Sequence, residues 1–208
     1  MRKIFKYKGE NNMAQIGLKD FVVVELTKDT KNELKYGAEI KSLVGAQNVK
    51  ISPKADTAKL YGDDKLLETT SALGEIEVET EVAELSYEER AFLLGHEYKD
   101  GVLYESSVFN PPEVALGFKA LKSSGGYKYV WLTKGKFEPV EDEGKTKGDK
   151  VEYQTQKIKA TFMPRIHDEM YKISLDTDFN KMSEDDFFNT TFLEKKINDE
   201  SPESGSGE

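Results

Sequence analysis

Residues 114–134, VALGFKALKSSGGYKYVWLTK, decide the fold class. Two runs rich in apolar and aromatic residues flank residues 123–126, SSGG, which are the small, flexible residues that a reversal of the chain requires. Each run has the length and composition of a strand. The stretch therefore predicts an antiparallel β-hairpin, and with it a mainly β domain.

The second run of this hairpin is apolar on both faces. Aromatic side chains alternate along one face, and Val130 and Leu132 lie on the other. A strand of this kind is covered on both sides, either by a second sheet or by a neighbouring subunit. An aromatic face can also serve as a carbohydrate platform, although aromatic residues in strands usually pack. The residues assigned to the core or to a subunit interface are Tyr127, Tyr129 and Trp131.

Upstream, residues 75–82, EIEVETEV, alternate strictly between acidic and mostly apolar positions. Like charges two positions apart on a strand are separated by about 6.6 Å and repel by roughly 0.6 kcal/mol in water, so this acidic face must be wet. It is either an ordinary solvated face or a surface that repels polyanions. The four acids are Glu75, Glu77, Glu79 and Glu81.

A short helix is predicted directly after this strand. Ser86 and Glu89 have the spacing of a capping box, and Gly95 supplies a left-handed stop. Tyr87, Ala91 and Leu94 are expected to share one face of this helix.

The remaining strands are less sharply marked by the sequence. The charged run 139–150 is expected to be a loop. Pro53 is expected to end the strand that precedes it. The predicted strands are 18–26, 43–52, 151–164 and 170–175.

Residues 55–72 are long, polar and weakly patterned, and we predict an extended hairpin or arm that leaves the core. An excursion of this length from a compact domain usually has a function. At the other end, Ser183 is predicted to begin a helix that runs to about Lys196, with Phe188 and Phe192 on one face. The final SPESGSGE is expected to be a disordered tail.

Composition excludes several classes of function. The net charge is −9, and residues 63–89 carry ten acids but one lysine, so the chain lacks the clustered cations of a DNA-wrapping protein. Cysteine is absent, which excludes disulfides and thiolate metal sites. No run approaches the roughly 18 apolar residues of a membrane span. The opening MRKIFKYKGENN has no apolar core after its first cations, so we expect that it is not a signal peptide. We expect the chain to stay in the compartment where it is made.

No motif for catalysis or for a cofactor stands out. The acids around Asp176 and Asp178 lack the glycine and distal glutamate of a calcium loop. The two histidines, His96 and His167, belong to no catalytic or metal-binding pattern. We therefore predict no enzyme activity, no metal and no cofactor.

Six stretches in order resemble one family, the major tail (tail-tube) proteins of long-tailed, non-contractile phages (siphophages) of Gram-positive hosts. The resemblance covers roughly Met13 to Leu175, and none of its pieces is a catalytic signature. The stretches are MAQIGLKDFVVVELTKDT from Met13, YGAEI, GEIEVETEVAEL, AFLLGHEY, VALGFKALKSSGGYKYVWLTKGKFEP and TKGDKVEYQT.

This resemblance implies a β-sandwich with one short flanking helix. The family pattern does not include residues 176–208, where the residues themselves predict a helix, so the expected fold is an antiparallel β-sandwich with one short flanking helix and a C-terminal helical appendage. Six copies would close into a ring whose inner sheets form one barrel, and the rings would stack into a tube. Its partners would be further copies of the chain, the tape-measure protein, and the tail-tip and tail-terminator proteins. Viral DNA would pass through the lumen without specific binding. The chain would occur in the virion tail, and in the host cytoplasm during assembly.

The resemblance also implies roles for two sets of residues. The acidic face of Glu75, Glu77, Glu79 and Glu81 would line the lumen. The arm would reach the next ring through Thr57, Leu60, Tyr61, Asp63 and Asp64.

We expect the chain to divide into an upstream extension (1–12), a tail-tube β domain (13–175) and an acidic C-terminal helix with a disordered tail (176–208). Residues 1–12 carry four cations and precede the resemblance, and codons for Lys8-Gly9-Glu10 can contain a ribosome-binding sequence, so Met13 is the expected start.

Two alternative functions remain: a tube protein of a contractile or secretion machine, and a β-sandwich carbohydrate-binding module.

Overall fold

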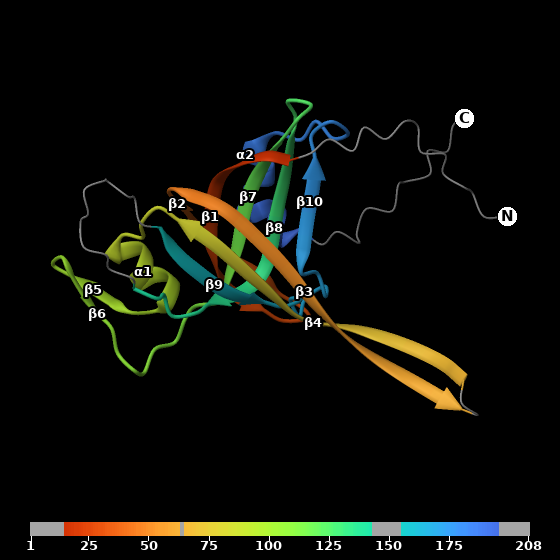
Figure 1. The fold of residues 1–208 in the computed structure, drawn as a ribbon. Helices are drawn as coiled ribbons and strands as arrows, with labels where there is room; N and C mark the ends of the chain where they lie inside the picture. Colours follow the sequence, from red (N-terminus) through yellow and green to blue (C-terminus); the bar gives the residue numbers. More distant parts are fainter. Residues whose placement is uncertain (1–14, 63–64, 143–154, 196–208) are drawn as a thin grey trace, which may run out of the picture.

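Strands make up most of the chain. The computed structural model describes residues 15–62, 65–142 and 155–195, which form ten strands and three short helices (Figure 1). The predicted mainly β class is confirmed. The strands are β1 (Gln15–Asp29), β2 (Leu34–Leu43), β3 (Ala46–Gly62), β4 (Lys65–Val82), β5 (Glu97–Lys99), β6 (Val102–Tyr104), β7 (Val114–Lys122), β8 (Tyr127–Phe137), β9 (Gln156–Phe162) and β10 (Lys172–Asp176). The helices are α1 (Tyr87–Leu94), α2 (Glu184–Phe187) and α3 (Thr190–Glu194).

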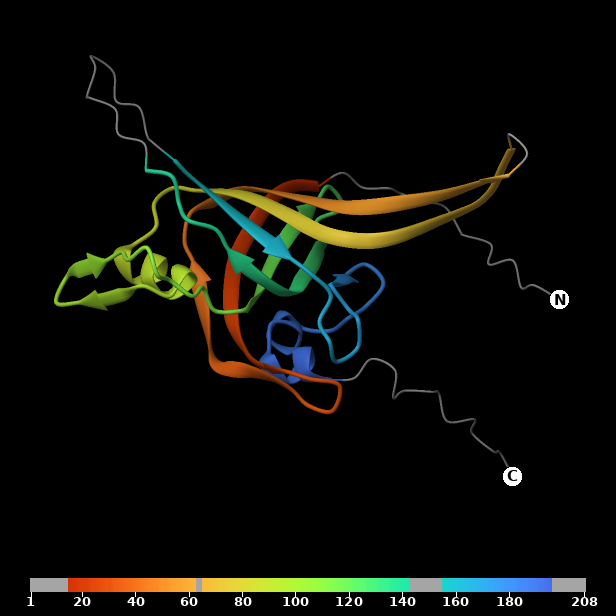
Figure 2. The same cartoon turned by 90° about the horizontal axis from the view of Figure 1, so that it is seen from below.

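The main sheet folds over on itself to make a sandwich. Its strand order is β2-β1-β7-β8-β9-β4-β3, with every pairing antiparallel, and β10 also pairs with β8. Strand β8 joins the two layers because residues 128–132 pair with β10, whereas residues 135–137 pair with β9. One layer therefore contains β2, β1, β7, β8 and β10, and the other contains β9, β4 and β3 (Figure 2).

The larger core lies between these two layers. Phe21 and Phe118 stack in it with ring centroids 5.4 Å apart. The second layer contributes Ile76, Val78 and Phe162, each at most 1% exposed. At roughly 1.5–3 kcal/mol for each fully buried large apolar side chain, this cluster is the main source of the sandwich's stability.

A second core covers the opposite face of the β1-β7-β8 layer. Helices α2 and α3 lie on that face (Figure 2), and Trp131, Phe187 and Leu193 are fully buried between them and the sheet. The Trp131 indole N–H donates to the Phe187 carbonyl at 3.0 Å. Gly117 leaves room for the indole, since a Cβ there would lie 2.8 Å from it. The C-terminal helices are thus packed on the domain.

Several local predictions are confirmed. The hairpin appears as β7 and β8, and residues 18–26 lie within β1. Helix α1 has the predicted capping box, and Gly95 adopts a left-handed φ of 69°. The strand predicted at 170–175 corresponds to β10, and that at 151–164 is observed as β9 in its described part.

Three local predictions were wrong. Pro53 does not end a strand, because β3 is an edge strand where a missing N–H costs no ladder bond, and the register shifts beside it. The strand predicted at 43–52 instead spans the end of β2, a two-residue turn and the start of β3. The single helix expected after Ser183 is two helices, since Asn189 caps α3 anew.

Some predictions fall outside the described residues. These include the upstream extension, the C-terminal tail beyond Lys195 and most of the 139–150 loop. In the part of the chain that is described, the longest helix has eight residues, so no helix there could span a membrane.

Candidate assembly surfaces

The predicted arm is the outer part of the β3–β4 hairpin. These two strands pair from Ala46 with Val82 out to Gly62 with Lys65, whereas β9 pairs with β4 only over residues 76–82. From Leu73 outward, the ribbon therefore has two strands and leaves the body of the domain (Figures 1 and 2). At about 3.3 Å per residue, residues 55–62 alone extend about 25 Å. The extended hairpin predicted for 55–72 is confirmed.

The residues proposed for inter-ring contact lie along this ribbon. Thr57 is opposite Ser71, and Leu60 is opposite Glu68. Tyr61 is opposite Leu66, one position from the end of β3. Asp63 and Asp64 lie outside the described residues. The backbone thus places three of the five on the projecting ribbon, and their role in assembly stays a prediction.

The four glutamates share the outer face of β4, as the alternation predicted. Ile76, Val78, Thr80 and Val82 point the other way and are at most 1% exposed. By contrast, the side chains of Glu77 and Glu79 are 49% and 54% exposed. This outer face belongs to the layer of β3, β4 and β9 and is open in the single chain.

Lysines on the neighbouring strands lie beside these glutamates, an arrangement that the sequence alone does not reveal. On β3, Lys54 forms an ion pair with Glu77, and this hydrogen bond raises the pKa of Lys54. Lys50 lies 3.5 Å from Glu79. Partners 23 to 29 positions apart in the sequence meet only through the β3–β4 register, so no local pattern reveals them.

The opposite neighbour, β9, adds two more lysines to the same face. Lys157 lies 3.9 Å from Glu81, and the register places Lys159 beside Glu79. Asn48 Nδ2 of β3 donates to Glu81 at 2.9 Å. The glutamate column therefore runs between two columns that contain lysine.

The aromatic face of β8 belongs to the core of the single chain. Trp131 is fully buried, Tyr129 is 6% exposed and Tyr127 is half-buried, all under α2 and α3. Tyr129 packs against Phe187 and Phe188 with centroid distances of 5.5 and 5.4 Å. The sequence left core and subunit interface open, and the chain's own helices provide the cover. The buried Trp131 cannot act as a carbohydrate platform.

A buried ionic cluster anchors the C-terminal helices. Arg165, with a fully buried side chain, donates to both carboxylate oxygens of Asp168 at 2.7 and 2.6 Å. It also donates to the Leu193 carbonyl of α3 at 2.8 Å and to the Tyr36 hydroxyl at 3.2 Å. Burial raises the pKa of Tyr36 to about 12. The i, i+3 spacing of Arg165 and Asp168 was the only sequence signal for this cluster.

A second buried pair lies close by. Lys134 donates to Asp29 at 2.8 Å, and Asp29 also accepts from the backbone N–H groups of Ile166 and His167. Burial alone would raise the pKa of Asp29, but these hydrogen bonds and the lysine charge outweigh it and lower that pKa. The pair fixes the end of β1 to the loop that leads into the C-terminal segment.

One side of the molecule exposes apolar side chains around α1 and the β5–β6 hairpin. This lobe lies at the opposite end of the domain from the arm (Figures 1 and 2). Exposed apolar residues of this kind, when gathered, mark contact surfaces. They are Tyr87 (58%), Tyr98 (42%), Val102 (46%), Tyr104 (55%), Val108 (88%) and Phe109 (36%).

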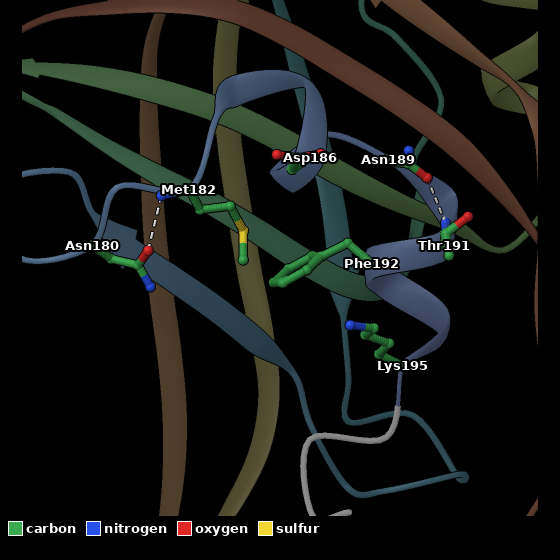
Figure 3. Close-up of a pocket in the computed structure, with 7 residues that line it drawn as sticks. All are labelled: Asn180, Met182, Asp186, Asn189, Thr191, Phe192 and Lys195. Carbon is green, nitrogen blue, oxygen red and sulfur yellow. Dashed lines mark hydrogen bonds between the residues drawn. The ribbon is translucent and has the colours of Figure 1, made fainter. Parts of the chain in front are cut away.

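An open pocket of about 500 Å³ lies beside α2 and α3 (Figure 3). Two of its polar groups stabilise the local backbone: Asn180 accepts from the Met182 N–H at 2.9 Å, and Asn189 accepts from the Thr191 N–H at 2.7 Å. Asp186 accepts from Ser183 at the start of α2. The residues that line the pocket are Asn180, Met182, Asp186, Asn189, Thr191, Phe192 and Lys195.

Several titratable groups that could suggest a metal or catalytic site are engaged in structural contacts instead. Asp176 and Asp178, whose sequence lacks a calcium loop, both accept from Lys122 at 2.8 and 2.5 Å. His167 lies against the Thr30 carbonyl, and His96 packs on Phe109. Among the described residues, no group of three or more His, Cys, Asp or Glu is arranged to hold a metal ion.

Comparison with known proteins does not place the chain in a family. A scan against models of protein families found no match, and no curated protein matches the sequence. The resemblance to the siphophage tail-tube family therefore stays a prediction.

Proposed function

We propose that this chain is a structural subunit that assembles with copies of itself into rings, and that these rings stack into the tail tube of a long-tailed, non-contractile phage. In this role the tube is the conduit for DNA ejection, and the protein performs no catalysis. The rings would be hexameric, as the resemblance implies.

The single observation that carries the proposal is the β3–β4 arm. An isolated two-stranded ribbon is marginally stable in water and exposes its backbone edges to pairing with other chains. Among the described residues, those of β3 and β4 between 55 and 73 pair only with each other. A partner outside the domain is the simplest reason for a chain to keep such a ribbon, and another copy in the next ring is the partner we propose.

The edges of the second layer support lateral association. Among the described strands, β3 ends the sheet, and none of them pairs with its outer edge. Among the same strands, β9 pairs with β8 only over residues 160–162, and residues 156–158 have no strand beside them on that side. A layer open at both edges can be extended by copies on either side, and ring closure would remove both edges.

Further partners follow from this proposal. The tape-measure protein and viral DNA would occupy the lumen, and tail-tip and tail-terminator proteins would close the tube at its ends. The chain would reside in the virion tail after assembly in the host cytoplasm. The outer face of Glu75, Glu77, Glu79 and Glu81 would line the lumen.

Shortening the arm tests the proposal. Residues 57–71 are replaced by Asn-Gly, a two-residue turn that joins Asp56 to Ala72, which are paired in the ribbon. We expect a folded monomer, judged by circular dichroism and thermal melting, that forms no tubes at concentrations where the full chain does.

The matched control keeps the length of the ribbon. Val44→Asn makes the same Asn-Gly pair with Gly45 in the turn between β2 and β3, outside the ribbon, and this variant should still assemble. Normal tubes from the shortened chain would refute the role of the arm in assembly.

A further inference from the structure

The outer face of the second layer has an ordered pattern of charge. Four glutamates form its central column on β4, and lysines stand on the strands at either side. Within residues 46–55, 75–82 and 156–162 of these strands, the four acids are matched by four cations. The lysines are Lys50 and Lys54 on β3 and Lys157 and Lys159 on β9.

The strand register brings these charges into rows. Glu79 lies between Lys50 and Lys159, and Glu81 lies between Asn48 and Lys157. Ion pairs form between these neighbouring charges: Lys50 with Glu79 at 3.5 Å, Lys157 with Glu81 at 3.9 Å, and Lys54 with Glu77. Lys159 also has Glu141 at 3.9 Å. The face is thus balanced in charge, although its central strand is acidic.

Without the neighbouring glutamates, these lysines would be well placed to bind a polyanion. The side chains of Lys50, Lys54, Lys157 and Lys159 are 51–72% exposed, and they lie on one rigid, open face. Exposed cations on one face bind the phosphodiester backbone without reading sequence, and each phosphate contact releases counterions.

We infer that this face is a latent binding site for the DNA backbone, and that the glutamate column blocks it by neutralising the flanking lysines. The role of the blockade rests on the proposed function, in which DNA moves past this face. Lysines already paired within the chain offer little to a passing phosphate, so DNA passes without sticking.

This account differs from simple repulsion by an acidic surface. If the face only repelled DNA, neutral residues in place of the glutamates would yield a surface with nothing to bind. If the glutamates mask lysines, the same change creates a binding site. The two accounts therefore predict opposite results for one variant.

The test uses dilute, unassembled protein and fluorescence anisotropy of a labelled duplex DNA. The variant is Glu77→Gln with Glu79→Gln, whose side chains are about half exposed. We expect it to bind at least about tenfold more tightly than the unaltered chain at 50 mM salt. Its affinity should fall with rising salt, with a slope in log–log form of about −2 to −4 for two to four phosphate contacts.

Two further variants make the test specific. Glu39→Gln with Glu97→Gln changes the net charge equally at exposed positions on β2 and β5, and should leave DNA binding unchanged. Adding Lys50→Gln and Lys159→Gln to the first variant should abolish the gained binding. The inference is overturned if the first variant binds no better than this charge-matched control, or if the added lysine changes leave binding intact.

These outcomes are separate from the fate of the proposed function. The binding measurement needs no tube, so a chain that never assembles can still support or overturn the inference. A chain that assembles normally, but whose Glu77→Gln, Glu79→Gln variant ignores DNA, would overturn the inference alone.

Discussion

Replacing Asp168 by Asn removes one charge from the buried cluster that anchors α3. The Asp168 carboxylate is 3% exposed and accepts two hydrogen bonds from Arg165, whose own side chain is fully buried. Asn keeps the size of Asp and one acceptor, but it leaves the guanidinium charge without a counter-charge. Removing one partner of a buried pair typically costs about 3–5 kcal/mol.

The structure favours the lower end of this range. Arg165 keeps its bonds to the Leu193 carbonyl and the Tyr36 hydroxyl, so part of its hydrogen-bonding capacity stays satisfied. We expect a loss of about 3 kcal/mol in the free energy of unfolding. With a urea m-value of about 2–3 kcal/mol/M, the unfolding midpoint should fall by about 1–1.5 M.

The assay is equilibrium urea unfolding followed by Trp131 fluorescence, since this indole lies under the anchored helices. The matched control is the double variant Arg165→Met with Asp168→Leu, which removes both charges and should cost less than Asp168→Asn alone. A loss below about 1 kcal/mol for Asp168→Asn would show that the cluster does not anchor the helices.

Two further predictions concern stability. Hydrogen bonds and the charge of Lys134 lower the folded-state pKa of Asp29, so ionised Asp29 stabilises the fold at pH values above its unfolded pKa of about 3.9, and this stabilisation is lost as the pH falls through the folded-state pKa. Asp29→Asn should therefore make the free energy of unfolding depend less steeply on pH in acid. An unchanged pH dependence in acid would contradict this. Gly95→Ala should destabilise the chain by at least about 1 kcal/mol in thermal or urea unfolding, because the residue has a left-handed φ and a Cβ would lie 2.4 Å from the Asn110 carbonyl oxygen; a neutral effect would contradict the observed cap.

The sequence was most informative where local chemistry fixes the backbone. The turn residues 123–126 and the alternation of the second run predicted β7 and β8, and Ser86, Glu89 and Gly95 predicted both ends of α1. These interactions join residues that are close in the chain, so they can be predicted without knowledge of the rest of the fold.

Strand β2 was missed because its pattern is not that of a simple alternating strand. Over residues 34–43 the deeply buried positions are Leu34, Tyr36 and Leu43, and the residues between them are polar or small apart from the partly buried Ile40. Its pairing with β1 is also interrupted by register shifts, which disturb the period of two. The break between α2 and α3 was also missed. Asn189 caps the start of α3, whereas the i, i+4 spacing of Phe188 and Phe192 indicated one continuous helix.

Of the candidate surfaces, too, the sequence predicted the features that lie within one strand and missed those that depend on contacts between strands. The acidic face was predicted because alternation lies within one strand. Its lysine partners were not, since Lys50, Glu79 and Lys159 meet only through the register of three strands. The same holds for Asp29 and Lys134, which are 105 positions apart.

Self-assembly is the central claim, and negative-stain electron microscopy of the purified chain at high concentration tests it most directly. The account predicts tubes of uniform width made of stacked rings, which lengthen as concentration rises and are absent when residues 57–71 are replaced by Asn-Gly. Monomers alone, at high concentration and across several salt conditions, would contradict it.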